Sequence, residues 1–355
     1  MVEGNVRMRL GRLVSVTGLS VLLLVGGSSI AVAQGNGNAN GNGNNGNNNG
    51  NGNGNGQGQD NGNPFHGKTD SGDDAHILPT PDVLLGSSGA KPTFATSTGL
   101  TSVTTANYGP NSISFHGGPQ ISTASYFAVY WNAAVANSTE TSNGYNFLSD
   151  QIAAFVGSFG SGVNDYTVIQ QYGRGSTPIS PILPYKGKYM DLKSSQSSIT
   201  DSSIRSWLTG LFNGGKVPVD PNMLYGLYFP PGMKVNINFF QSSCTYLCGY
   251  HSSFSYSGKT IKYAVYPYLN CSGCSMTGKK VADMLTIVSS HEIREAVTDP
   301  LGNAWYDSQG NEADDKCVWH NLYQMQNGNH WVQPEFSQGG LVNGFTYPGP
   351  GCVVP

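Results

Sequence analysis

The spacing of apolar and polar residues predicts a mixture of strands and helices from about residue 108 onward. Short apolar and aromatic runs favour buried strands, whereas apolar residues at three- and four-residue steps favour helices with one buried face. Asp201 is a candidate helix cap, and Ser257 and Gly258 are expected to form a hairpin turn. The expected strands are 126–131, 166–172, 223–229, 235–240, 252–256 and 261–266, and the expected helices are about 145–159, 201–212 and 277–297. This order predicts an α+β domain in which a mixed sheet precedes a long helix.

The pattern near the start of the chain is that of an export signal. Three arginines precede the apolar stretch 13–25, and Ala31-Val32-Ala33 offers the small residues that a signal peptidase accepts. Residues 1–33 are therefore expected to be a signal peptide, with an uncleaved N-terminal anchor as the alternative. No other stretch approaches the about 20 apolar residues that a membrane helix needs. We thus expect a secreted, extracellular protein without a membrane span after signal removal.

A Gly/Asn tract follows the signal. Residues 35–63 contain 14 Asn and 11 Gly, and such a tract buries too little apolar surface to offset the entropy of the chain. It would serve as a spacer or a sticky surface segment, or it is a tolerated repeat expansion. Residues 64–96 remain rich in Pro, Gly and Asp. A disordered linker is therefore expected over 34–96, followed by a single domain over 97–355.

Composition limits the classes of function. Charged residues make up only 11% of the chain and the formal net charge is −3, so there is no basic surface of the kind that neutralises phosphates. Nucleic acid is therefore not an expected partner. The hydrophobic fraction of 38% is enough for a core, and 48 Gly and 19 Pro indicate many turns.

Six cysteines, an even number, indicate disulfides in an exported chain. They are Cys244, Cys248, Cys271, Cys274, Cys317 and Cys352. We expect two bridges among the first four of these cysteines and a third bridge between Cys317 and Cys352. The alternative for the first four is a four-thiolate zinc site on the CxxxC and CxxC spacings, which an oxidising destination disfavours.

The long helix expected at 277–297 carries the candidate chemistry. Its sequence places His291 and Glu295 one turn apart on the same face, a spacing that lets a helix offer two ligands to one metal ion. Glu292 points about 100° away from His291, close enough to take a proton from a water beside the metal. The second ligand departs from the His-Glu-x-x-His of zinc peptidases, but zinc accepts a carboxylate. The alternative is an exposed, charged helix face that binds nothing.

Carboxylates are concentrated around this helix, which indicates a site for a cation in so charge-poor a chain. Eight of the 21 acidic residues lie within 33 residues, namely Asp283, Glu292, Glu295, Asp299, Asp307, Glu312, Asp314 and Asp315. The segment 305–312 is expected to form a hairpin that delivers Glu312 or Asp315 as a third ligand, with a solvent-facing polar turn as the alternative. The oxygen-rich loop would also suit calcium. It lacks the spacing of a dedicated calcium loop, so zinc is the expected metal.

The other histidines of this part of the chain are weaker candidates. His320 and His330 follow the acidic segment, and either could replace a carboxylate as the third ligand. We expect His251 to be a packed residue rather than a ligand. His116 lies beside Gly117-Gly118-Pro119 and is expected to shape a turn rather than to line a substrate cleft.

Five short motifs occur in an order that is typical of one protein family. They are Phe115-His116-Gly117-Gly118-Pro119, Cys248-Gly249-Tyr250-His251, Cys271-Ser272-Gly273-Cys274, His291-Glu292-x-x-Glu295, and Asn303-Ala304-Trp305-Tyr306 with Glu312-x-x-Asp315-x-Cys317. From about residue 108 onward the chain thus resembles the EXORDIUM (phosphate-induced protein) family. The resemblance implies a secreted, extracellular or cell-wall-associated protein and assigns no firm biochemical activity. The chain departs from the family at Ile293-Arg294 and at Asp299, which replaces an Asn and adds a carboxylate near the proposed metal.

Together these observations predict an exported, single-domain α+β protein with disulfides and a zincin-like metal helix. As an enzyme it would be a zinc-dependent hydrolase in which His291, Glu295 and Glu312 or Asp315 hold the ion and Glu292 is the base. Extracellular peptides or proteins are the expected substrates, by analogy. The alternative is a non-catalytic protein that binds an extracellular or cell-wall component and has a structural metal site. A catalytic metal keeps one position open for water, whereas a structural metal is fully coordinated by the protein.

Overall fold

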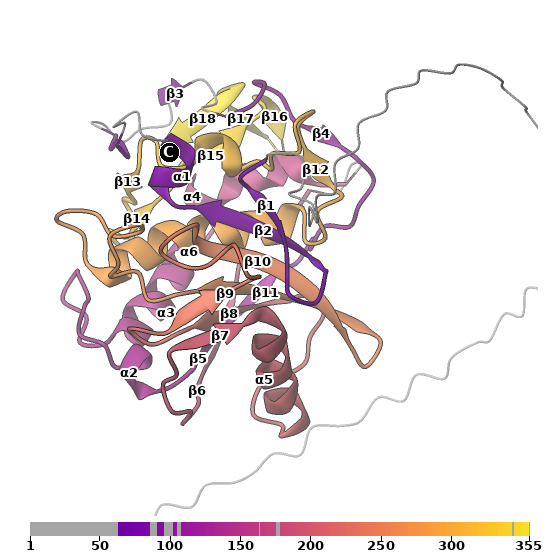
Figure 1. Ribbon diagram of the computed structural model, residues 1–355. Helices are drawn as coiled ribbons and strands as arrows, with labels where there is room; N and C mark the ends of the chain where they lie inside the picture. Colours follow the sequence, from indigo (N-terminus) through magenta and orange to yellow (C-terminus); the bar gives the residue numbers. More distant parts are fainter. Residues whose placement is uncertain are drawn as a thin grey trace, which may run out of the picture. The chain divides into compact units, whose positions relative to one another are not determined.

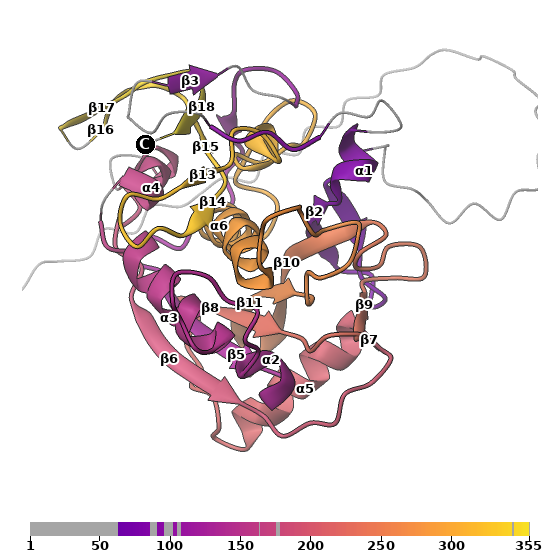
Figure 2. The same cartoon turned by 90° about the vertical axis from the view of Figure 1, so that its left-hand side faces the viewer.

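A seven-stranded mixed sheet forms the centre of the computed structural model, which describes residues 63–85, 91–95, 102–104, 108–162, 164–174, 178–342 and 344–354. All of these residues lie in one compact unit, Gly56–Pro355. In spatial order the strands are β1 (His66–Lys68), β2 (Asp74–Pro79), β10 (Leu247–Tyr256), β11 (Lys259–Tyr266), β8 (Met223–Tyr228), β5 (Ser125–Tyr130) and β6 (Tyr185–Met190). The last four are parallel, whereas β10, β2 and β1 extend the sheet through antiparallel pairs. Figure 2 shows the sheet from β6 on the left to β2 on the right.

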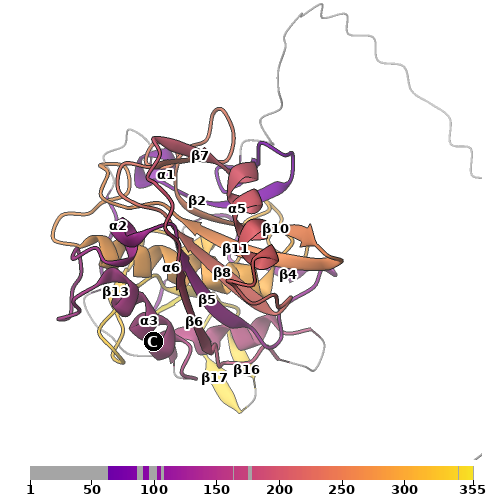
Figure 3. The same ribbon diagram turned by 90° about the horizontal axis from the view of Figure 1, so that it is seen from below.

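Helices cover both faces of this sheet. α3 (Leu148–Phe159) and α6 (Val281–Thr298) pack on one face, and α5 (Asp201–Asn213) packs on the other. The strands supply both cores because their side chains alternate: Tyr126 and Ala128 face α3 and α6, whereas Phe127 faces α5. In Figure 1, α6 lies above the sheet and α5 below it. Seen from below, α5 lies in front of the sheet and α6 behind it (Figure 3).

Short elements complete the unit, and they surround α6 more than α5. The helices are α1 (Pro81–Leu85), α2 (Ala133–Ala136) and α4 (Asn164–Thr167), with 3-10 turns at Val168–Tyr172 and Asp315–Cys317. The strands are β3 (Ser102–Thr104), β4 (Ser114–Phe115), β7 (Ser198–Thr200), β9 (Lys234–Asn236), β12 (Trp305–Tyr306), β13 (Tyr323–Gln324), β14 (Trp331–Val332), β15 (Glu335–Ser337), β16 (Gly340–Val342), β17 (Phe345–Tyr347) and β18 (Gly351–Val354). The elements after α6 wrap back over it, and β14 packs directly against it.

The predicted mixture of helices and strands is confirmed, with a mixed sheet. The β10–β11 hairpin turns at Ser257 and Gly258, where φ is +48° and +74°. The expected strand at 166–172 is wrong, because this segment forms α4 and the following 3-10 turn. Tyr166, Ile169 and Tyr172, three residues apart, all reach the core, and periodicity alone does not separate a short buried helix from a buried strand.

Three local expectations also need correction. The cap of α5 is Thr200, whose side chain accepts from the Ser203 backbone N–H, whereas Asp201 is buried in the first turn. β9 ends at Asn236 rather than at residue 240. The segment 305–312 is not a hairpin on itself, since β12 pairs with β4, and Asp307 begins a turn.

The N-terminal part of the described chain also differs from the expectation. We expected residues 34–96 to be a linker, yet His66–Leu85 forms β1, β2 and α1, with β2 buried between β1 and β10 in the main sheet. The sequence of β2, Asp-Ala-His-Ile-Leu-Pro, is short and lies in a stretch rich in Pro, Gly and Asp, and its pairing with β10 is what places it in the main sheet. The expected signal peptide at 1–33 and the Gly/Asn tract up to residue 62 lie outside the described residues.

All six cysteines form disulfides. The pairs are Cys244–Cys271, Cys248–Cys274 and Cys317–Cys352. This confirms the expected grouping and excludes the four-thiolate zinc site, because oxidised sulfurs have no thiolate to offer. Cys248 on β10 and Cys244 just before it are both tied to the loop before α6, and the third bridge ties the 3-10 turn Asp315–Cys317 to β18. None of the described helices combines the length and the apolar character needed to cross a membrane.

Candidate metal centre

α6 is buried along its entire length, which decides how its charged residues are interpreted. The Lys280 N–H donates to the Asp283 carboxylate at its start, at 3.0 Å, and Pro300 follows its end at Asp299. All of its residues are buried, including His291, Glu292 and Glu295, which are at most 1% exposed. The alternative of an exposed, charged helix face is therefore wrong.

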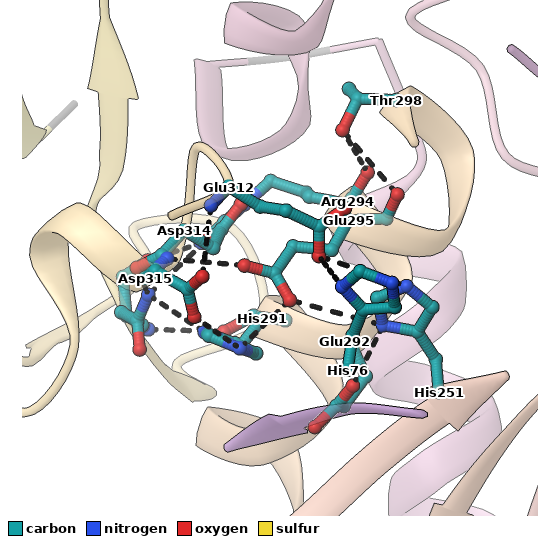
Figure 4. Close-up of polar contacts among 12 residues, drawn as sticks. His76, His251, His291, Glu292, Arg294, Glu295, Thr298, Glu312, Asp314 and Asp315 are labelled. Carbon is teal, nitrogen blue, oxygen red and sulfur yellow. Dashed lines mark hydrogen bonds and ion pairs between the residues drawn. The ribbon is translucent and has the colours of Figure 1, made fainter. Parts of the chain in front are cut away.

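Side chains from separate parts of the chain meet beside α6. β2 contributes one histidine, β10 contributes another, α6 contributes three residues, and the segment after β12 contributes two carboxylates. They are His76, His251, His291, Glu292, Glu295, Glu312 and Asp315. Figure 4 shows their imidazoles and carboxylates pointing toward one another. Their exposed fractions run from 0 to 5%, so the cluster is shielded from water.

The eight carboxylates concentrated in this part of the sequence separate into two classes. Four have donors that satisfy them. Asp283 caps α6, Asp299 accepts three backbone N–H groups at 2.7–3.0 Å, Asp307 pairs with Lys316 at 2.6 Å, and Asp314 pairs with Arg294. The carboxylate that Asp299 adds is therefore used to fix a loop. The other four face the cluster, and their ion pairs within the described residues are all to histidine rings.

His291, Glu295 and Asp315 form the first group of converging donor atoms. His291 Nε2 lies 3.0 Å from Glu295 Oε2 and 3.9 Å from Asp315 Oδ1. Donor atoms around a tetrahedral zinc, with bonds of about 2.0–2.2 Å, lie roughly 3.3–3.6 Å apart. His291 Nε2 makes no hydrogen bond, while Nδ1 lies 3.2 Å from the Gln333 amide nitrogen, a contact that fixes the ring. The three donors can therefore hold a metal ion, and Asp315 is the third member of this group.

Glu312 belongs to a second group, with His76 and His251. Its Oε2 lies 3.0 Å from His76 Nδ1 and 3.8 Å from His251 Nε2. Neither nitrogen has a hydrogen-bond partner. The Glu312 backbone N–H donates to Asp315 Oδ2 at 2.8 Å, which links the two groups through one turn.

Glu292 lies between the two groups. Its Oε2 accepts from His251 Nδ1 at 3.1 Å, and its Oε1 has no hydrogen-bond partner. Glu292, His251 and Glu295 also lie close enough to share a cation. One oxygen of Glu292 is thus held in place while the other is available to accept a proton.

Burial sets the protonation of the cluster. It raises the pKa of Glu292, Glu295, Glu312 and Asp315 well above the ordinary carboxyl values, and repulsion from neighbouring carboxylates adds to the shift. Burial also lowers the pKa of His76 and His291, and it lowers that of His251 to about 3. Without a cation the carboxyl groups retain protons. A divalent cation would replace those protons, because ligands must be deprotonated to bind it.

Two glycines permit the close packing at this centre. A side chain at Gly249 on β10 would lie 2.5 Å from Val288 Cγ1 and 3.0 Å from Glu292 Oε1, so glycine lets α6 approach the sheet here. Gly302 has a φ of +67°, and a Cβ there would lie 2.2 Å from His76 Nε2. Each glycine makes room for a residue of the cluster.

The remaining histidines are not brought into the centre. His330 lies against Tyr145 and Phe155, and within the described chain neither His330 nor the half-buried His320 belongs to a group that could hold a metal. His116 is exposed and stacks on the Tyr306 ring at 3.6 Å. The expectation for His251 needs correction, because this residue is packed and also faces the cluster.

His76 is the cluster residue that sequence reasoning missed. It lies in a Pro/Gly/Asp-rich stretch, and only the pairing of β2 with β10, which sets His76 opposite His251, brings it to the centre. A signal was present in the alternation Ala75-His76-Ile77, which has the period of a strand with the histidine on the opposite face from its apolar neighbours.

No protein-family model, curated protein or solved structure matches this chain. The fold and the site themselves define an α+β protein with three disulfides and a buried histidine and carboxylate cluster that could hold a metal ion.

Proposed function

We propose that this chain is a secreted, EXORDIUM-like, zinc-dependent hydrolase with a zincin-like domain. The observation that carries the proposal is the group His291, Glu295 and Asp315. Its buried donor atoms converge, and His291 Nε2 faces both carboxylates but makes no hydrogen bond. These residues would hold the ion. The packing of a His-Glu-x-x-Glu helix against one face of a mixed sheet supports the comparison with zincins.

The chain's own residues have distinct roles in this proposal. A zinc ion in such a site polarises a carbonyl and makes water more acidic. Glu292 takes a proton from the attacking water through Oε1, because Oε2 is already held by His251. Afterwards Glu292 returns that proton to the leaving amine. Peptide bonds of extracellular proteins are the proposed substrate class.

The proposed metal and location follow from the donors and the cysteines. An imidazole with two carboxylates suits zinc, whereas calcium prefers an all-oxygen set. Three disulfides support an oxidising, extracellular destination, with the cell wall as one location.

A second candidate function is that of a non-catalytic extracellular or cell-wall-associated protein with a structural metal. The observation that favours it is burial: His291, Glu295 and Asp315 are at most 2% exposed, whereas a catalytic metal needs a position that water can reach. In that protein an ion held by the same three residues would fix the loop after β12 to α6.

Chelation separates these two functions. We expect the secreted protein to hydrolyse a mixed peptide library, to lose that activity in a strong chelator, and to regain it when zinc is added. Cleavage is read by mass spectrometry, and circular dichroism checks that the chelated protein remains folded. A zinc-containing protein that cleaves nothing would support the structural function, and activity that persists in metal-free protein would contradict the zinc hydrolase.

A further inference from the structure

The second group of donors has the composition of a metal site in its own right. His76, His251 and Glu312 offer two imidazoles and a carboxylate, a set that zinc uses in catalytic sites. Glu312 Oε2 lies 3.0 Å from His76 Nδ1 and 3.8 Å from His251 Nε2. These separations bracket the roughly 3.3–3.6 Å expected between ligands of one tetrahedral zinc. From this geometry we propose that His76, His251 and Glu312 hold a second divalent cation, so that the cluster is a two-metal centre.

The unpartnered atoms of this group point to a ligand. His251 Nε2, both ring nitrogens of His76 and both carboxylate oxygens of Glu312 are buried and make no hydrogen bond. Buried polar atoms are normally satisfied, and leaving one without a partner costs about 1–3 kcal/mol. A cation bound by His76 Nδ1, His251 Nε2 and Glu312 would give these three groups a partner.

Glu292 and the sheet orient the two imidazoles. The His251 Nδ1–H donates to Glu292 Oε2 at 3.1 Å, which leaves the lone pair of Nε2 for a metal, as in other carboxylate–histidine–metal arrangements. His76 and His251 are direct partners in the β2–β10 pair, and their rings stack at 4.9 Å with an interplanar angle of 14°. The register of β2 against β10 therefore sets the ligand positions.

The charges of the cluster also fit two ions. Four carboxylates converge here, and Arg294, the nearest cationic side chain on α6, is paired with Asp314 and Glu335. One divalent cation at His291, Glu295 and Asp315 balances two of the four negative charges. A second ion at Glu312, next to Glu292, balances the other two.

The second ion is the one nearer to solvent. His76 lines a surface pocket of about 140 Å³ together with Asp74, Ser252 and Pro300, and it is the one residue of the seven-residue cluster that does so. Water and small polar groups therefore reach the second ion first. In a two-metal site, one ion can activate the attacking water while the other stabilises the negative charge that develops on the carbonyl oxygen. The second site therefore deepens the proposed function, and it rests on that function for the first ion.

Metal content tests the second site separately from the first. We expect about two zinc ions per chain in wild-type protein dialysed against trace-zinc buffer, and a loss of one ion in His76→Gln. His291→Ala should lose the other ion. His66→Gln is the matched control, because His66 is the other histidine of the β1–β2 hairpin, its ring lies 4.9 Å from that of His76, and its Nε2 contacts the Gly310 carbonyl. The control should keep both ions.

The outcomes distinguish the two sites. One ion in the wild type that His76→Gln retains and His291→Ala loses would overturn the second site while the first stands. One ion lost in His76→Gln but retained in His291→Ala would support the second site and contradict the first. A Co²⁺ titration of the wild-type protein needs no variant and guards against misfolding: absorption of bound cobalt should rise to about two equivalents, and saturation at one would overturn the proposal.

Discussion

Replacing Glu292 with Gln is expected to lower peptide hydrolysis by about 10²- to 10⁴-fold, the usual contribution of a positioned general base. The zinc content and the melting temperature should remain close to those of the wild type. Gln has the shape of Glu, and its carbonyl oxygen can still accept from His251 Nδ1, but it cannot take a proton from water. The measurements are kcat/KM on a cleaved peptide, elemental analysis and thermal unfolding.

Glu140→Gln is the matched control for this change. Glu140 is a half-exposed glutamate in the loop between α2 and α3, and it pairs at 3.4 Å with Lys280, which precedes the first residue of α6. We expect it to retain full activity. If Glu292→Gln cleaves peptides as fast as the wild type does, Glu292 is not the base, and its role is reduced to orienting His251.

Removing the metal is expected to have the largest effect on stability. A ligand at about 1,000 times its dissociation constant stabilises the folded state by roughly 4 kcal/mol, so apo protein should unfold at a clearly lower temperature than zinc-saturated protein. The physical reason is that without the cation the four buried carboxyl groups have no ligand, and they are either protonated or, as the pH rises, charged and mutually repulsive. Thermal unfolding in zinc and in chelator measures the difference.

The difference should widen as the pH rises. In apo protein the four carboxyl groups have pKa values above those of the unfolded chain, so their protonation stabilises the fold fully below about pH 4, and this stability is lost as pH rises through the raised values. Zinc binds the deprotonated ligands, so its stabilisation grows over the same range. We expect a larger gap between the two melting temperatures at about pH 8 than at about pH 5.

A matched control for this experiment is His330→Gln. His330 is buried with both ring nitrogens unpartnered, as in the cluster, but it lies against Tyr145 and Phe155 instead. The difference between the melting temperatures with and without zinc should be the same in His330→Gln as in the wild type. Equal melting temperatures with and without zinc at both pH values would contradict a bound metal.

Much of the fold could be predicted from the sequence because its strands and helices have strong local signals. β8, with the sequence Met-Leu-Tyr-Gly-Leu-Tyr, is apolar throughout because it is buried on both faces, and the β10–β11 hairpin has a Ser-Gly turn. The segment 166–172 was misassigned because a short apolar run is compatible with either type of element. The strands β1 and β2 were missed because they are short and lie in a stretch rich in Pro, Gly and Asp, and only the pairing of β2 with β10 joins them to the main sheet.

The candidate site also has residues that the sequence predicts and residues that only the fold reveals. His291, Glu292 and Glu295 were predictable because they lie one turn apart on a single helix, and the concentration of carboxylates pointed to Glu312 and Asp315. Sequence reasoning could not sort those last two into different groups, since that depends on the path of the turn between them. The local alternation around His76 indicates a strand but not its place at this centre, because His76 lies 215 residues before His291 and is brought there by the pairing of β2 with β10.

Anomalous X-ray scattering at the zinc absorption edge, from crystals of the zinc-saturated protein, tests the central claim most directly. The claim is that His291, Glu295 and Asp315 hold a metal ion. We expect a strong peak about 2.0–2.2 Å from His291 Nε2 and from the carboxylate oxygens of Glu295 and Asp315. The absence of any peak among these three residues, with their side chains hydrogen-bonded to one another or to water instead, would contradict it.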